Sequence, residues 1–300
     1  FDVRQSGFSG ASINAVTRSG TNEFKGTGYF IFRNDGLAGS KADGKDIGNI
    51  NIDEKTAGLS IGGPIIKNKL FFFVNYEHSV VPTVVNSWRA STDGVGSQDK
   101  YISRTTQADL QRVKDYLKDN YGYDTGSYTD FPANETNTKL LGRIDWNITR
   151  NHHLALRYNR TVNTYFSNPN NSSSNCGQRT TESRVGLYSF SFANSMYSMN
   201  NNANTFSLDL HSRFTNDLSN QLLVTYSDLS DLRGSTSDPF PFIDILDGGM
   251  VATGALTPYM SVGYELFTWN NAVHNQVLTV KDDLVYYLGA HKIMAGLSYD

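Results

Sequence analysis

The feature that most constrains this fold is a regular alternation of short turns and long loops between amphipathic strands. Turns of a few residues are expected near 63–68, 149–151, 215–217 and 288–291, and long loops at 34–54, 79–136, 163–203 and 230–273. In a soluble sandwich, short and long connections would be mixed at both ends of the sheets. Short turns at one rim and long loops at the other indicate a transmembrane barrel, in which the short turns face the periplasm.

The expected strands, about nine in number, alternate apolar and polar residues. In one of the clearest, Leu140, Ile144 and Trp146 share a face, and Arg143 and Asp145 share the other. This period of two predicts an all-β, antiparallel sheet with one apolar and one charged face. Aromatic residues lie near strand ends, as in the interfacial girdles of membrane barrels: Tyr76, Trp146, Tyr158, Tyr226, Tyr286, Tyr287 and Tyr299.

Two segments depart from the strand pattern. Apolar residues at helical spacing predict one short helix at 107–121, in the loop 79–136, with Thr106 as its N-cap and Asp109 three residues on. In the last hairpin, Asp282 shares a face with apolar residues. A β-bulge near Asp282 and Asp283 is therefore expected, because it would turn one carboxylate toward the polar face.

Composition excludes two classes of protein. Only 38% of the residues are hydrophobic, and no apolar run approaches the roughly 18 residues that a membrane helix needs. Barrel strands need only about 9–11 residues with alternate apolar side chains, so a low mean hydropathy does not argue against them. The net charge is −3 without a block of Lys or Arg, which argues against nucleic acid as a partner.

No set of residues with a catalytic, cofactor-binding or metal-binding pattern is found, so an enzyme is not expected. His152 and His153 are adjacent in an expected hairpin, where neighbouring side chains point to opposite faces. The single cysteine, Cys176, cannot form an internal disulfide. The sequence does not indicate a role for Cys176.

Two stretches carry a family resemblance. The segment SGASINAVTRSGTNEFKGTGYFIFRN (9–34), followed by LSIGGPIIKNKLFFFVNYE (59–77), resembles the junction of plug and barrel in TonB-dependent outer-membrane receptors, in particular the Oar-like branch common in Bacteroidetes. The chain begins within this motif, so a partial chain is expected. The resemblance implies that residues 1–23 end a plug domain and that residues 24–300 form the first part of a barrel of about 22 strands.

The resemblance also implies a function in the bacterial outer membrane: active import of a nutrient such as a peptide, glycan or metal chelate. The partners would be the TonB complex, contacted through an upstream segment, the outer-membrane lipid, an unknown small or oligomeric ligand, and a surface lipoprotein that could cover the receptor. Charged residues could hold the plug to the wall, with Arg4 and Arg18 pairing with Glu77 or Asp145. The sequence names neither the cargo nor its ligand-binding residues.

Two alternatives remain open on the sequence. One is an outer-membrane adhesion or structural barrel that does not transport. The other is a soluble β-sandwich that binds carbohydrate, because a sandwich would also present one apolar and one charged face on each sheet.

Overall fold

The computed structural model describes residues 16–38, 41–43, 45–46, 52–131, 133–170, 174–175, 178–179, 184–246 and 258–300. Arg4 and Cys176 lie outside these ranges. Among the helices described, none is long and apolar enough to cross a membrane.

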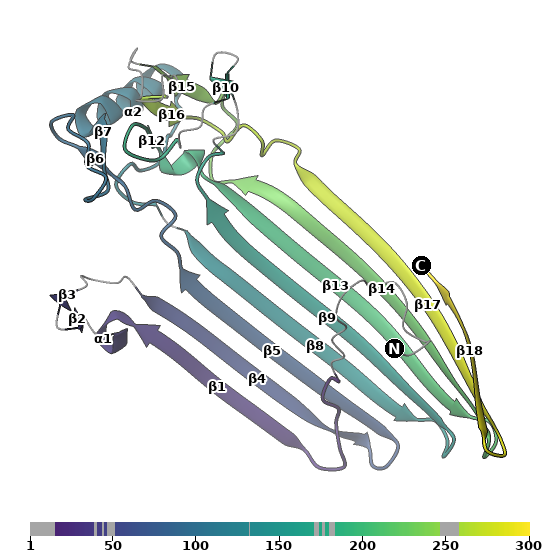
Figure 1. Cartoon of the computed structure of the whole chain (residues 1–300). Helices are drawn as coiled ribbons and strands as arrows, with labels where there is room; N and C mark the ends of the chain where they lie inside the picture. Colours follow the sequence, from purple (N-terminus) through teal and green to yellow (C-terminus); the bar gives the residue numbers. More distant parts are fainter. Residues whose placement is uncertain are drawn as a thin grey trace.

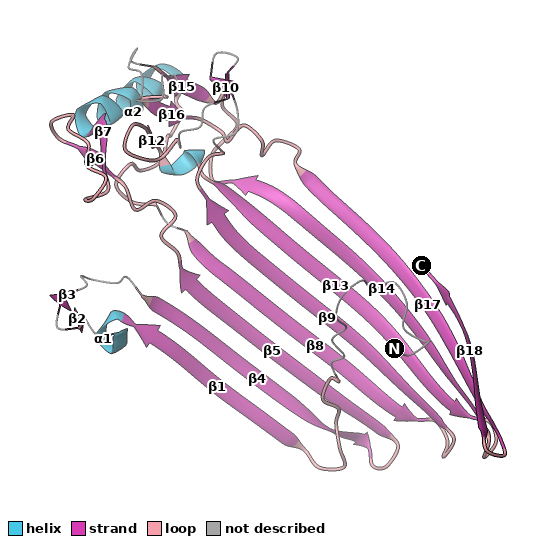
Figure 2. Ribbon diagram, viewed as in Figure 1, coloured by secondary structure: helices cyan, strands magenta, loops and turns pink. Residues whose placement is uncertain are grey.

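One antiparallel sheet of nine long strands dominates the structure (Figure 1). Each of its strands pairs with the next one along the chain, and the sheet is curved and not closed (Figure 2). Its strands are β1 (Lys25–Asn34), β4 (Asp53–Ile66), β5 (Leu70–Pro82), β8 (Asn134–Asn147), β9 (His152–Ser167), β13 (Tyr197–Arg213), β14 (Leu218–Ser235), β17 (Ala272–Leu288) and β18 (His291–Tyr299).

The predicted separation of short turns from long loops is confirmed. The short turns β4–β5, β8–β9, β13–β14 and β17–β18 lie along one rim, and the long connections leave from the other (Figure 1). Two of the turns use left-handed residues, Asn68 with φ 62° and Gly289 with φ 58°, and asparagine and glycine adopt this conformation at the lowest cost.

The long connections carry short elements of their own. The first holds α1 (Asp35–Ala38), β2 (Lys41–Ala42) and β3 (Lys45–Asp46), and the others hold a larger set. That set comprises β6 (Arg89–Ser91), β7 (Ile102–Thr106), α2 (Gln107–Tyr121), β10 (Ser174–Asn175), β11 (Gln178–Arg179), β12 (Phe190–Ser191), the 3-10 helix η1 (Ala193–Ser195), β15 (Ile243–Ile245) and β16 (Met260–Val262).

The helix α2 has the predicted bounds and cap. The Thr106 side chain accepts a hydrogen bond from the Asp109 backbone N–H at 3.1 Å. At the other end, Gly122 adopts φ 66°, and its N–H reaches the carbonyl oxygens of Leu117 and Lys118, which satisfies groups that a helix end leaves unpaired.

Three long connections pack together into one unit, here called the cap, which consists of residues 83–131, 133, 184–196, 236–246 and 258–271. Parallel pairing of β12 with β16 joins the connection that precedes β13 to the connection that follows β14. Within the latter connection, β15 pairs antiparallel with β16. The cap has a hydrophobic core of its own, made of Ala90, Leu110, Leu117, Tyr123, Phe190, Phe192, Met260 and Val262. The main hydrophobic cluster of the described chain therefore lies in the cap and not under the sheet.

The sheet leaves its apolar face uncovered. Phe30, Leu59, Phe206 and Leu278 are all exposed on it. An apolar face of this extent is not stable in water, whereas a lipid-facing wall requires one.

The apolar band ends in a row of aromatic residues. Tyr158, Phe206 and Tyr226 are direct neighbours on β9, β13 and β14, and the rings of Tyr158 and Phe206 stack at 4.6 Å. Two residues farther along each strand toward the long loops, the next side chains on the same face are Arg160, Asn204 and Asp228. This change from aromatic to polar residues marks one boundary of the membrane-facing band.

Beyond that boundary the strands continue, so the expected loops 79–136, 163–203 and 230–273 are shorter in the structure, whereas the expected loop 34–54 agrees with it to within two residues. The connections of the described structure begin after Asn34, Pro82, Ser167 and Ser235. Here β14 runs on to Ser235, roughly 25–30 Å past the aromatic row at about 3.3 Å per residue. In this extension neither face is continuously apolar, so the alternation that reveals a lipid-facing strand is missing.

The expected bulge at Asp282 and Asp283 is wrong. The register between β14 and β17 is continuous, with Leu222 opposite Asp282. Asp283 points to the polar face and pairs with Lys281 at 3.3 Å. Asp282 stays on the apolar face and accepts a hydrogen bond from the Asn220 side-chain amide at 2.6 Å. The carboxylate thus has a polar partner on this face without a bulge.

Candidate functional site: a docked linker on the polar face of the sheet

A linker of residues 16–24 enters the sheet by crossing its polar face. Its anchor is Arg143 on β8, whose Nη1 donates to the Thr17 carbonyl oxygen at 2.9 Å and to the Thr17 hydroxyl oxygen at 2.7 Å. This contact joins residues 126 positions apart in the chain. It is therefore a tertiary contact that holds the linker to the wall.

Asp145 orients the Arg143 guanidinium. The Arg143 Nε and Nη2 donate to the two Asp145 carboxylate oxygens at 2.8 Å and 2.6 Å. Both side chains are well covered, with 13% and 5% of their surfaces exposed. His153 Nε2 lies 3.4 Å from the same carboxylate. Two parallel hydrogen bonds fix the plane of a guanidinium, so Nη1 is left aimed at Thr17.

Two further contacts press the linker against the short turn between β4 and β5. The Asn22 amide nitrogen donates to Asn68 Oδ1 at 2.6 Å, and the Asn68 backbone N–H donates to Asn22 Oδ1 at 2.7 Å. Gly20 lies so close to the wall that an added Cβ would be 2.3 Å from the Phe72 carbonyl oxygen and 2.8 Å from that of Gly63. Glycine at position 20 is required by this close approach.

The predicted contact residues fall in different places. Asp145 belongs to the site, through Arg143. Glu77 on β5 accepts hydrogen bonds from the Tyr29 hydroxyl of β1 and from Lys139 Nζ of β8, the latter at 2.9 Å, and so links strands within the wall. Arg18 lines a small cavity between linker and sheet, and in the part of the chain described it forms no ion pair with Glu77 or Asp145. Arg4 is not among the described residues, so its pairing stays a prediction.

Sequence reasoning missed Arg143 as the anchor. The strand pattern placed its side chain on the polar face correctly, but the Thr17 groups that it holds are a carbonyl and a hydroxyl, which no charge pattern reveals.

A second ion cluster lies on the adjacent strands. Arg157 on β9 is the direct cross-strand neighbour of Arg143, and its Nη2 lies 3.0 Å from Asp209 on β13. His211 Nε2 is 3.1 Å from Asp209, and the Gln221 amide also donates to it at 3.0 Å. The two clusters together form a row of ion pairs along the middle of the polar face.

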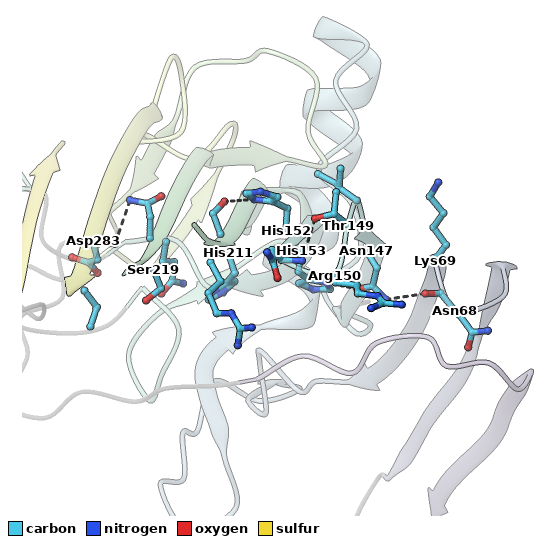
Figure 3. Close-up of a pocket in the computed structure, with 17 residues that line it drawn as sticks. Asn68, Lys69, Asn147, Thr149, Arg150, His152, His153, His211, Ser219 and Asp283 are labelled. Carbon is cyan, nitrogen blue, oxygen red and sulfur yellow. Dashed lines mark hydrogen bonds between the residues drawn. The ribbon is translucent and has the colours of Figure 1, made fainter. Parts of the chain in front are cut away.

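A cavity of ≈910 Å³ lies where this face meets the short-turn rim (Figure 3). His153 and His211 are direct cross-strand neighbours there, and His152 shares a 2.9 Å hydrogen bond with the Ser212 hydroxyl. Cationic groups exceed anionic ones in the lining, which includes Lys69, Arg150, Arg213 and Asp283. No cluster of three or more potential metal ligands occurs among the described residues.

Buried charges fasten the cap to the sheet. Glu265, fully buried in the cap, lies 3.3 Å from Arg233 Nη2 of β14, and it also accepts from the Thr268 hydroxyl at 2.6 Å. The Arg233 guanidinium in turn lies 3.7 Å from the centre of the Tyr197 ring of β13. A buried carboxylate needs such partners to remain charged, so this cluster fixes where the cap sits on the strand ends.

Comparison with known proteins identifies the family. A family model described as an outer membrane beta barrel domain matches residues 16–300. This chain belongs to that family. It lies in the outer membrane, and its nine-stranded antiparallel sheet is part of the barrel wall.

Similar proteins extend the comparison. Over 162 residues the chain is 26% identical to the TonB-dependent transporter Oar of Myxococcus xanthus. The matched region covers 51% of this chain and 14% of that protein. The Oar resemblance is thus matched by a protein from Myxococcus, and a Bacteroidetes branch is not shown.

Two solved structures from Acinetobacter baumannii are also similar. The siderophore receptor PirA matches with a TM-score of 0.37 and 10% identity, over 90% of this chain and 27% of the receptor. For the siderophore receptor PiuA the TM-score is 0.33 and the identity 11%, over 92% of this chain and 42% of the receptor. The chain spans less than half the length of each of these three proteins.

Proposed function

We propose that this chain is part of a TonB-dependent importer, in which residues 1–23 end a plug domain and the sheet supplies part of the surrounding wall. The observation that carries the proposal is the linker anchored by Arg143 on the polar face. A segment that must be released under a pulling force needs contacts that are specific but few, and two hydrogen bonds to one guanidinium meet that need.

The cap would meet cargo first, because it lies beyond the ends of the middle strands, such as β13 and β14, opposite the short turns (Figure 1). Transport would involve no covalent chemistry on the cargo. The energy would come from the TonB complex.

Growth-linked uptake by the complete receptor in its host tests this function, with and without TonB, across panels of peptides, glycans and metal chelates. The expected result is loss of uptake of one cargo class in both the receptor mutant and the TonB mutant. Unchanged uptake of every class, with altered surface adhesion in the receptor mutant, would contradict import and favour the adhesion barrel.

A further inference from the structure

A cavity of ≈480 Å³ opens on the cap, away from the linker and the polar face of the sheet. Segments far apart in the sequence build it: β7, the first turns of α2, and the pair β15 and β16. Its volume lies within the range of small-molecule sites. It is lined by Gly94, Arg104, Asp109, Arg112, Val113, Ile245, Leu246, Tyr259 and Met260.

The polar side of this cavity carries more positive than negative charge. Arg112 is 81% exposed and contacts Asp109 at 3.4 Å through Nη2 alone. Arg104 lies over the Tyr259 ring, 5.1 Å from its centre, and its Nε donates to the Tyr188 carbonyl oxygen at 3.0 Å. These contacts fix the direction of the Arg104 side chain, and the Arg112 guanidinium keeps most of its N–H groups toward solvent.

Among the described residues that line the cavity, the one carboxylate, Asp109, already has hydrogen-bond partners within the fold. Asp109 Oδ2 accepts from the Thr106 hydroxyl at 2.8 Å and from the Tyr259 hydroxyl at 2.9 Å. These bonds belong to the capped start of α2. Asp109 is therefore placed to hold Arg112 in position, and it is poorly placed to accept a bond from a cationic ligand.

The opposite side of the cavity is apolar and opens onto the cap core. Met260 is 1% exposed and belongs to the core, and Val113 and Ile245 pack against it. An apolar group bound there would be desolvated by residues that the cap already holds in place.

We propose that this cavity binds a carboxylate that carries an adjacent apolar group, such as the apolar C-terminal residue of a peptide, with Arg112 as the carboxylate ligand. The inference rests on the proposed import function, whose cargo class it narrows. Guanidinium groups bind carboxylates through paired hydrogen bonds. The cationic excess of the rim cavity, at the other end of the wall, would suit the exit of the same kind of cargo.

Fluorescence anisotropy with the complete receptor in detergent tests this site without any need for transport. The probe is a fluorescein-labelled Gly-Gly-Ala-Leu-Phe peptide with a free C-terminal carboxylate, compared with its C-terminal amide and with a version ending in Ser. Octanoate serves as an unlabelled competitor. The free acid should bind at least about tenfold more tightly than either altered peptide, and Arg112→Gln should weaken it by about the same factor.

The matched control is Arg89→Gln, which removes another cap arginine that does not line the cavity and should leave the affinity within about twofold. Competition by octanoate would assign the site to apolar carboxylates in general, and no competition would assign it to peptides. Equal binding of acid and amide, or equal losses in Arg112→Gln and Arg89→Gln, would overturn the proposal. Peptide binding without TonB-dependent uptake would refute import but leave the site standing.

Discussion

At the scale of single residues, the linker is held by few groups with distinct tasks. Arg143 makes the bonds to Thr17, Asp145 orients Arg143, and Gly20 allows the backbone to approach the wall. Because each of these contacts depends on one residue, a single substitution can disrupt it without changing the strands. The wall also offers a matched residue for comparison, Arg157, which has an ion pair but no linker contact.

Arg143→Gln should free the linker. The change removes the charge-assisted bonds to Thr17 and Asp145, each worth about 1.5–3 kcal/mol. Cells with this variant of the complete receptor should become more sensitive to vancomycin, a solute that an intact plug would exclude. Arg157→Gln, which breaks the neighbouring ion pair, should leave sensitivity close to that of the unaltered receptor. Equal sensitivity of both variants would count against a linker anchor at Arg143.

Gly20→Ala tests the close approach of the linker. The new methyl group would meet the Phe72 carbonyl oxygen at 2.3 Å, and overpacking of this kind costs about 1–3 kcal/mol. The thermal unfolding midpoint of the purified receptor should fall. Gly142→Ala, at a position with nothing within 4 Å of the added atom, is the control. A fall of the same size in Gly142→Ala would show that the loss is not specific to the linker.

At the scale of elements, the strands in the membrane band and the helix could be predicted, and the cap could not. Alternation reveals a strand only where one face meets lipid, as at Leu156 and Tyr158. The extension with Asn200 and Asn202 lacks an apolar face, so the sequence pattern predicts a loop there. The cap core joins Leu110, Phe190 and Met260, whose spacing in sequence carries no periodic signal. Arg143 was placed on the correct face, but its partner Thr17 was not predicted.

Glu265→Gln should loosen the cap from the strands. The change removes the fully buried negative charge that pairs with Arg233 and accepts a hydrogen bond from the Thr268 hydroxyl. Breaking a buried ion pair costs about 3–5 kcal/mol. Proteinase K added to intact cells should then cut the cap faster. Asp119→Asn, an exposed change on α2, should not alter the rate. Unchanged cleavage of Glu265→Gln would mean that other contacts hold the cap.

The start of α2 should weaken in acid. Hydrogen bonds from the Thr106 and Tyr259 hydroxyls hold the pKa of Asp109 below its usual range. A depressed pKa stabilises the fold above the pKa of the unfolded chain, near 3.9, and this contribution is lost as the pH falls through the lower folded value. Amide hydrogen exchange at 107–121 should differ between the unaltered protein and Asp109→Asn near pH 6, and this difference should shrink as the pH falls below about 4. A difference in exchange that stays constant over this pH range would show that ionisation of Asp109 does not stabilise the start of α2.

At the scale of the whole molecule, the apolar face, the aromatic row and the separation of turns from loops point to one arrangement. In this arrangement the membrane would surround the half of the strands nearer the short turns, the other strand ends and the cap would project outward, and the short turns would face the periplasm. The two edges of the sheet, β1 and β18, need further strands before the wall can stand in lipid, because every backbone group there must be paired.

The orientation of the wall is tested most directly by cysteine labelling of intact cells with a membrane-impermeant maleimide. Lys118→Cys places a thiol on the cap and Asn216→Cys places one on a short turn, each in a Cys176→Ser background. The expected result is that Lys118→Cys is labelled in intact cells and Asn216→Cys only after the outer membrane is permeabilised. Labelling of Asn216→Cys in intact cells, with Lys118→Cys protected, would contradict this arrangement of the barrel.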